Sequence, residues 1–256
     1  MPQGNMSGPQ TVLAGILDIG ELLLTSGAEV MRVEDTITRL CMVYGFVKVD
    51  VFTITSSIVL TVTAADGEIF TQTRRIRARD TDLGRVERVN ALSRQLCQAP
   101  LPAEELRQAV QQVRNGPAYP EQVRFWMYAL TAGVFSVFFG GNVWDAAAAA
   151  VAGAFLFLIL KSGQRLRLNS ILLHMLCSAL TALLIVGLTR LGLGQNPDKI
   201  IIGNIMLLIP GLALTASLRD MINGDTISGL LGFCEATLKA LAIAIGFAAI
   251  LTGLGG

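Results

Sequence analysis

The chain has 256 residues, a mean hydropathy of +0.58 and a formal net charge of +1. Charged residues are unevenly placed: residues 1–124 hold 13 Lys/Arg and 14 Asp/Glu, whereas residues 125–256 hold 7 and 5. This shift argues against a uniformly soluble protein and predicts a disordered N-terminus (1–10), a soluble domain (11–122) and a membrane domain (123–256). The four cysteines show no CxxC or Cys/His spacing, so we expect no disulfide framework, no metal site and no cofactor.

The soluble domain begins with two predicted helices. Apolar residues at helical spacing cover residues 11–25 and 31–44. Between them, Ser26 and Glu29 have the spacing of a capping box, in which each side chain binds the backbone N–H of the other residue. We therefore expect the second helix to start directly after a Thr-Ser-Gly turn.

The hydrophobic period then changes from 3.6 to 2, which predicts a small antiparallel sheet. Asp66-Gly67 is a strong hairpin signal, and strands are expected over residues 47–51, 57–63 and 69–76. Asp80 or Asp82 is expected to cap a helix that runs through Leu96, and Pro102 to open another that ends near residue 115. The domain is thus predicted to be α+β.

Two charged features of this domain invite a functional interpretation. Residues 74–79 carry four arginines and could bind nucleic acid or anionic lipid, but a solvated strand end is the simpler interpretation, and no nucleic-acid partner is expected. A set of four carboxylates could host acid–base chemistry, but no nucleophile, histidine or phosphate loop accompanies it. Solvated or ion-paired helix faces are favoured, and the chain is not expected to be an enzyme; the four are Asp18, Glu21, Glu34 and Asp35.

The second half is predicted to be a multi-pass α-helical membrane domain with five transmembrane helices. The apolar runs lie at about 123–140, 146–161, 170–188, 200–217 and 229–252. The linker 161–167 holds three positive charges and no acid, which places it and the N-terminus in the cytoplasm. No signal peptide is expected, and an odd number of spans places the C-terminus outside. Such a module can be half of a solute path that a partner or a second copy completes.

Several polar residues interrupt these apolar runs. Pro210-Gly211 lies inside the fourth run with Asn204 upstream, which predicts a broken span or, alternatively, a passive kink with a packing amide. Glu235 and Lys239 are four residues apart in the fifth run, so they share a helix face and form either a functional ion pair or a structural clasp. His174 in the third run could relay protons or bond a carbonyl of a neighbouring helix.

The long stretch from Gly203 to Gly229, GNIMLLIPGLALTASLRDMINGDTISG, resembles the signature of the threonine/serine exporter family. The early motifs Asp18-Ile-Gly-Glu21, Ser26-Gly-Ala-Glu29 and Arg32-Val-Glu-Asp35 resemble its cytosolic domain. Single-chain members have about ten spans, so a chain with five is similar to the larger subunit of the split, two-component form. The resemblance implies a second small membrane subunit and export of threonine and serine or, for the split form, of dicarboxylates such as succinate.

These observations predict a subunit of a secondary exporter in the bacterial cytoplasmic membrane that moves a small carboxylate-bearing metabolite outward. The substrate path is assigned to Asn204, Pro210, Gly211, Arg219, Asp220, Glu235 and Lys239. Glu235 is the preferred proton carrier and His174 the alternative, because protonation of Glu235 would also release Lys239. The competing hypothesis is a non-transporting membrane sensor or scaffold subunit, for which residues 74–79 would matter instead.

Overall fold

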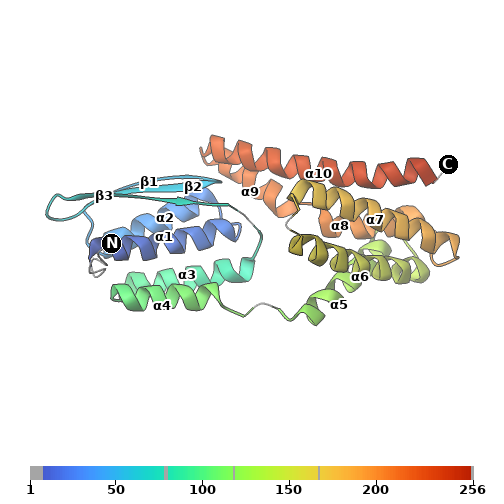
Figure 1. Cartoon of the computed structure of the whole chain (residues 1–256), viewed down its shortest axis with the longest axis horizontal. Coiled ribbons are helices and arrows are strands. Elements are labelled where there is room, and N and C mark those ends of the chain that lie inside the picture. The colour runs from blue at the N-terminus through green and yellow to red at the C-terminus, as the bar shows by residue number, and fades with distance from the viewer. Residues whose placement is uncertain (1–7, 78–79, 118, 167, 255–256) are drawn as a thin grey trace. The chain divides into compact units, whose positions relative to one another are not determined.

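A computed structural model describes residues 8–77, 80–117, 119–166 and 168–254. Its N-terminal part follows the predicted order of two helices, an antiparallel sheet and two helices (Figure 1). The bounds are α1 Pro9–Thr25, α2 Val30–Val43, β1 Lys48–Ile54, β2 Ser57–Thr63, β3 Ile69–Arg75, α3 Leu83–Gln98 and α4 Ala103–Arg114. Because α1 starts at Pro9, the last two residues of the segment expected to be disordered are helical, and residues 1–7 lie outside the described part.

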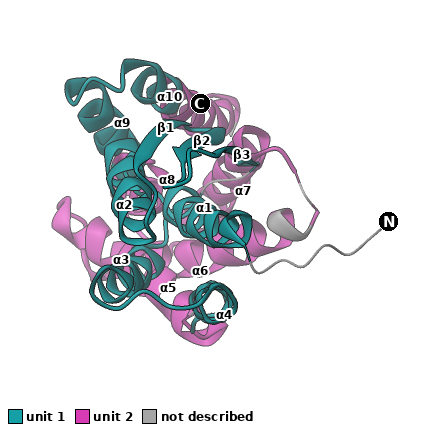
Figure 2. Ribbon diagram, turned by 90° about the vertical axis from the view of Figure 1, so that its left-hand side faces the viewer, with its two compact units in different colours: residues 1–117, 212–233 teal, residues 118–211, 234–256 magenta. Residues whose placement is uncertain are grey.

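The C-terminal part is helical throughout its described elements. These are α5 Glu121–Phe138, α6 Val143–Arg165, α7 Ser170–Arg190, α8 Pro197–Leu208, α9 Gly211–Ile222 and α10 Thr226–Leu254. The chain divides into two units, shown in different colours in Figure 2: unit 1 is residues 1–117 with 212–233, and unit 2 is residues 118–211 with 234–256. Unit 1 therefore contains α9 from Leu212 and the start of α10 in addition to the whole N-terminal part.

The N-terminal part of unit 1 is built in layers around α1. The sheet has the order β1-β2-β3, with Val51 opposite Leu60 in the first ladder and Leu60 opposite Gln72 in the second. Alternation along β2 buries Ile58 and Leu60 against the helices, while the other face of the strand is half-exposed. Helices α1 and α2 cover this sheet, and α3 and α4 pack on them from the other side (Figure 1).

The predicted capping box at the start of α2 is wrong. Glu29 is the N-cap residue without a side-chain cap bond, and its carboxylate forms an ion pair with Arg219 instead. The buried Ser26 hydroxyl has no hydrogen-bond partner among the described residues. The Val30 N–H donates to the Asp220 carboxylate at 3.2 Å, so a residue 190 positions away caps this helix. Sequence spacing identified a helix start but not the side chain that caps it.

Helices α9 and α10 form a tight hairpin at the position of this cap. Gly224 closes the turn with φ of +100°, and the Asp225 N–H donates to the Asp220 carbonyl at 2.9 Å. A Cβ on Gly229 would lie 2.7 Å from the Ser217 carbonyl oxygen, so only glycine allows the two helices to approach this closely. Directly before Gly229 on α10, the Ser228 hydroxyl donates to the Thr53 carbonyl at 3.3 Å. The hairpin is thus bonded to both α2 and β1.

The ion-paired interpretation of the early carboxylates is confirmed for Asp18, Glu21 and Asp35, but not for Glu34. Arg74 lies 2.6 Å from Asp18 and 3.6 Å from Glu21, and Arg114 lies 3.6 Å from Glu21. These contacts tie β3 and α4 to α1. Asp82, one of the two expected caps of α3, accepts from the Arg85 N–H at 2.8 Å. Of the basic run 74–79, Arg74 is therefore committed to this cluster, and residues 78–79 lie outside the described part.

Glu34 joins α2 to the sheet. Its carboxylate accepts the Thr53 N–H at 2.7 Å, so Thr53 binds Glu34 through its N–H and Ser228 through its carbonyl. Partial burial raises the pKa of Glu34 above 4.5, opposed by the hydrogen bond from the Thr53 backbone, while the charge of Asp225 raises the pKa further. Ionised Glu34 is therefore less favourable in the folded domain than in the unfolded chain.

Unit 2 is held together by small residues. A Cβ on Gly153 of α6 would lie 2.7 Å from the Tyr128 carbonyl oxygen of α5, and one on Gly203 of α8 would lie 2.5 Å from that of Ala132. Close helix approach through small residues is typical of membrane bundles. Asp145 is fully buried and accepts four hydrogen bonds, from the N–H groups of Asn142, Gln195 and Asn196 and from the Asn196 amide. Asp145 therefore closes the first turn of α6 through the Asn142 N–H and anchors the α7–α8 loop.

Three helices within the described ranges are long and apolar enough to cross a membrane: α6, α7 and α10. A fourth span results if α8 and α9, bent by 51°, are counted as one broken span. The predicted first span corresponds to α5, which is not apolar enough to be counted because its first turn contains Glu121, Gln122 and Arg124. The structure thus gives three or four candidate spans and does not confirm the five that were predicted.

Replacing Asp220 with alanine should destabilise unit 1. The change leaves the buried Val30 N–H without an acceptor, which costs about 2 kcal/mol. Exposure of the buried Cys41 thiol in denaturant, measured with the other three cysteines changed to serine, reports this unfolding. Asp50→Ala is the control, because it removes only the exposed pair with Lys48, worth roughly 0.5 kcal/mol. Equal losses in the two variants would contradict the cap.

The raised pKa of Glu34 predicts a pH dependence of the stability of unit 1. The folded domain holds the Glu34 proton more tightly than the unfolded chain, so this contribution is present below pH 4.5 and lost as pH rises through the folded pKa. The stability of Glu34→Gln relative to wild type should therefore increase as pH rises above 4.5, measured by Cys41 exposure. Glu104→Gln, on the exposed first turn of α4, should follow wild type. A difference that is constant with pH would refute this expectation.

Candidate functional site

The helix break predicted at Pro210 is present. Helix α8 ends at Leu208, Ile209 is extended with ψ of 126°, and α9 starts at Gly211. Pro210 has no N–H, so the Met206 carbonyl cannot receive its usual helical bond. The Gly211 N–H donates across the break to the Ile209 carbonyl at 2.9 Å. The last carbonyls of α8 and the N–H groups that follow Gly211 lack partners within their own helices. Such a break presents backbone donors and acceptors that an unbroken span would hide.

Asn204 is fully buried one turn before this break. Its side-chain N–H₂ donates to the Ile200 carbonyl at 2.9 Å and to the Ala149 carbonyl of α6 at 3.3 Å. Its side-chain oxygen has no hydrogen-bond partner in the described part of the chain. The amide therefore packs α8 against α6, and one buried acceptor remains for another donor.

Glu235 and Lys239 form the expected ion pair on α10. The ammonium nitrogen lies 2.8 Å from the carboxylate, and 52% of the Glu235 side chain and 21% of the Lys239 side chain are exposed. Leu231, Leu238 and Leu241 nearby on the same helix are also exposed. The pair is thus located on a face of α10 that the other described residues of the chain leave largely uncovered.

His174 is not joined to that pair by any hydrogen bond or ion pair within the described ranges. Its Nδ1 lies 2.6 Å from the Ser170 carbonyl oxygen, one turn earlier on α7. The predicted bond to a carbonyl of a neighbouring helix is therefore wrong for the described residues, because the carbonyl belongs to α7 itself. The Nδ1 atom of His174 is therefore engaged within α7 itself.

Arg219 and Asp220, also assigned to the path, lie in unit 1. Both are engaged by the start of α2, through Glu29 and the Val30 N–H. Sequence reasoning missed this docking and the bonds of Thr53 with Glu34 and Ser228. The neighbouring Arg219 and Asp220 were a weak sign of this docking. An acid can accept the free N–H groups at a helix start, and a cation beside it can pair with Glu29 there.

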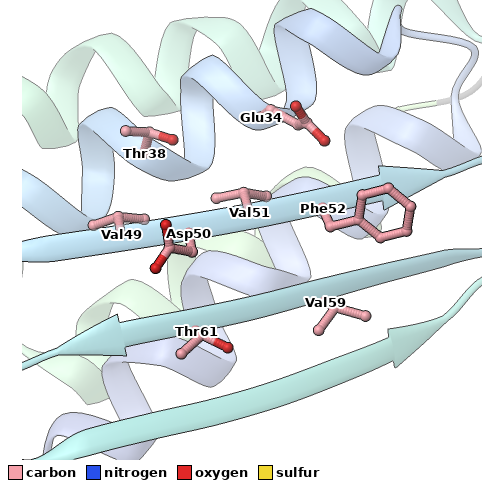
Figure 3. Close-up of a pocket in the computed structure, with 8 residues that line it drawn as sticks. All are labelled: Glu34, Thr38, Val49, Asp50, Val51, Phe52, Val59 and Thr61. Atoms are coloured by element: carbon pink, nitrogen blue, oxygen red, sulfur yellow. The ribbon is translucent and has the colours of Figure 1, made fainter.

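Two hollows of unit 1 could admit a small molecule. The first, about 410 Å³, lies along α2 and β1, and Figure 3 shows Glu34 and Asp50 among its lining residues. The second, about 730 Å³, lies between α2 and α3 and is named here the arginine hollow. It is lined by Glu29, Met31, Arg32, Asp35, Thr36, Arg39, Asn90, Ser93, Arg94, Cys97 and Gln98. Volumes of this order are typical of ligand sites.

The described residues contain no group of three or more His, Cys, Asp or Glu side chains placed to hold a metal ion. Cys41 and Cys177 are buried and Cys97 and Cys234 exposed, and all four are free thiols.

Comparison with known proteins identifies the family. A family model described as "Putative threonine/serine exporter" matches residues 15–254. A "Probable succinate transporter subunit YjjP" of Klebsiella aerogenes is 26% identical over 98% of this chain and 96% of its own length. A "Probable threonine/serine exporter" of Mycobacterium tuberculosis is 23% identical over 95% of this chain, which spans only 46% of that relative. No solved structure matches. The chain belongs to the threonine/serine exporter family.

Proposed function

We propose that the protein is one subunit of a two-component secondary exporter of small carboxylate metabolites in the bacterial cytoplasmic membrane. The full-length match to a relative named as a succinate transporter subunit supports a dicarboxylate such as succinate as substrate, with threonine or serine as the alternative. The longer relative, of which this chain spans 46%, supports a second small membrane subunit that supplies the rest of the path.

The Glu235–Lys239 pair is the observation that carries this proposal. Charged groups on a membrane helix are costly against lipid, about 2.5–3.5 kcal/mol each on insertion scales. An exposed pair on α10 is therefore best accommodated if this face meets water or the second subunit. Lys239 then attracts the solute carboxylate, and a proton taken up by Glu235 dissolves the ion pair and releases Lys239. This couples solute movement to the proton gradient.

The break at Pro210-Gly211 supports a second element of the path. Backbone groups at a broken span contact solute and ions in other secondary transporters. The Asn204 oxygen, which accepts no hydrogen bond from the described residues, supplies one more acceptor near the break. Arg219 and Asp220 act at the cytoplasmic entrance, where they also bind α2. His174 is the alternative proton carrier, and its engaged Nδ1 makes it the weaker one.

We further propose five spans, with α5 as the first in spite of its polar first turn. The positive linker 161–167 then lies in the cytoplasm together with the N-terminal domain, and the C-terminus lies outside. Lys161 pairs with Glu121, so the polar first turn of α5 and the end of α6 are at the same level of the bundle. Both ends then belong at the cytoplasmic surface, where charged residues are tolerated.

Glu235→Gln should abolish proton-coupled export. The amide keeps the shape of the side chain but cannot ionise, so the ion pair no longer switches with protonation. Export of succinate from preloaded proteoliposomes that contain both subunits measures this. Asp198→Asn, an exposed acid at the start of α8, is the control and should export as wild type. Wild-type flux from Glu235→Gln would end the coupling mechanism, and export of threonine but not succinate would reassign the substrate.

Pro210→Leu should also abolish export while the protein still inserts into the membrane. Leucine restores the backbone N–H and favours an unbroken α8–α9 helix, which removes the exposed backbone groups. The same proteoliposome assay applies, with protease protection to confirm insertion. Pro197→Leu is the control, because a proline at the first helical position breaks no interior bond. Normal export by Pro210→Leu would show that the break is only a passive kink.

A further inference from the structure

The arginine hollow between α2 and α3 has an unbalanced charge. Among its lining residues, Glu29 is paired with Arg219 and Asp35 is paired with Arg39 at 2.8 Å. Arg32 and Arg94 remain, and neither has a hydrogen-bond or ion-pair partner among the residues that the structure describes. The surrounding half of the chain holds nearly equal numbers of basic and acidic residues, so this local excess is not a property of the domain as a whole.

The other lining groups and the size suit a small polar anion. Asn90 adds a side-chain amide to the two guanidinium groups, whereas the Ser93 hydroxyl already donates to the Asn90 carbonyl at 3.0 Å. The volume of about 730 Å³ is within the range of ligand sites. Guanidinium groups bind carboxylates through paired, charge-assisted hydrogen bonds. The hollow along β1 has the opposite character, because Glu34 and Asp50 line it and would repel an anion.

We propose that the arginine hollow is a binding site for a small dicarboxylate, with Arg32 and Arg94 each binding one carboxylate. The choice of a dicarboxylate rests on the proposed function. The hollow is lined by residues of α2 and α3 and by neither Pro210 nor Glu235, so it is a second site, distinct from the helix break and the ion pair of the proposed path. Occupancy of this site follows the concentration of the exported solute on the side of the membrane where the N-terminal domain lies.

The wall of the hollow offers a route from binding to transport. Glu29 lines it and holds Arg219 of α9, next to the Asp220 that caps α2. A dicarboxylate beside Glu29 competes with that carboxylate for cations and weakens its hold on Arg219. Ligand binding therefore changes the free energy with which the α9–α10 hairpin is docked on α2.

Cys97 gives a direct readout of occupancy. It lines the hollow and is exposed, whereas Cys41 and Cys177 are buried. In the full chain purified in detergent with Cys234→Ser, N-ethylmaleimide should modify Cys97, and succinate should slow this reaction saturably. Arg32→Ala and Arg94→Ala should each raise the half-protecting succinate concentration about tenfold, the worth of one charge-assisted bond. Arg107→Ala, an exposed arginine of α4 outside the hollow, should leave it unchanged.

The comparison is made within each variant, with and without ligand, because loss of an arginine also alters the intrinsic reactivity of the thiol. No protection by succinate, equal protection by sodium chloride at matched ionic strength, or unchanged protection in the Arg32→Ala/Arg94→Ala double variant would each overturn the site. Stronger protection by phosphate or serine than by succinate would overturn its assignment to a dicarboxylate.

Transport and binding fail independently, so the two proposals can be separated. If succinate protects Cys97 but wild-type proteoliposomes export none, the proposed function fails and the site stands. If export is normal and protection absent, the site fails and the proposed function stands. In proteoliposomes, the double variant should retain export at saturating succinate but reach half its maximal rate at a different succinate concentration, because only the transport path then responds to succinate on the side that carries the N-terminal domain. An unaltered dependence would refute the regulatory role.

Discussion

Polar groups in an apolar helix must find partners, and this constraint organises the membrane half of the chain. Asp145 satisfies it internally with four donors, so it is part of the architecture. Asn204 satisfies it through its N–H₂ group but not its oxygen. Among the described residues, Glu235 and Lys239 satisfy it only through each other, on a largely uncovered face of α10. The less a polar group is satisfied within the chain, the stronger the argument that it serves solute or a partner subunit.

The second organising feature is the family's longest motif, residues 203–229, which contributes residues to both units. Its first part forms α8 and the break at Pro210, while its second part forms the α9–α10 hairpin. The hairpin is docked on α2 and β1 through Asp220 and Ser228 and belongs to unit 1. A short stretch of sequence therefore connects the proposed path to the N-terminal domain. The arginine hollow lies beside this connection, because its lining residue Glu29 pairs with Arg219. The proposed role of the N-terminal domain is therefore to regulate export.

Local rules explain why much of the fold could be predicted. The strands and their Asp66-Gly67 hairpin, the cap at Asp82 and the break at Pro210 all depend on residues within a few positions of each other. The same holds for the Glu235–Lys239 pair, which helical spacing alone brings together. The capping box at Ser26 failed for the opposite reason: a distant carboxylate, Asp220, occupies the position that the local motif was expected to fill.

The sequence by itself determined the order of the elements, the division into charged and apolar halves, and the residues at which helices start, break and carry charge. Those features follow from backbone stereochemistry and from hydrophobic periodicity, which act over one or two turns. Only the tertiary structure decided that Asp220 caps α2, that Asp145 accepts four hydrogen bonds, and that Arg32 and Arg94 share a hollow in which neither pairs with a described acid. Contacts across 50 to 190 residues depend on how separate elements pack, and no local pattern in a single sequence records that packing.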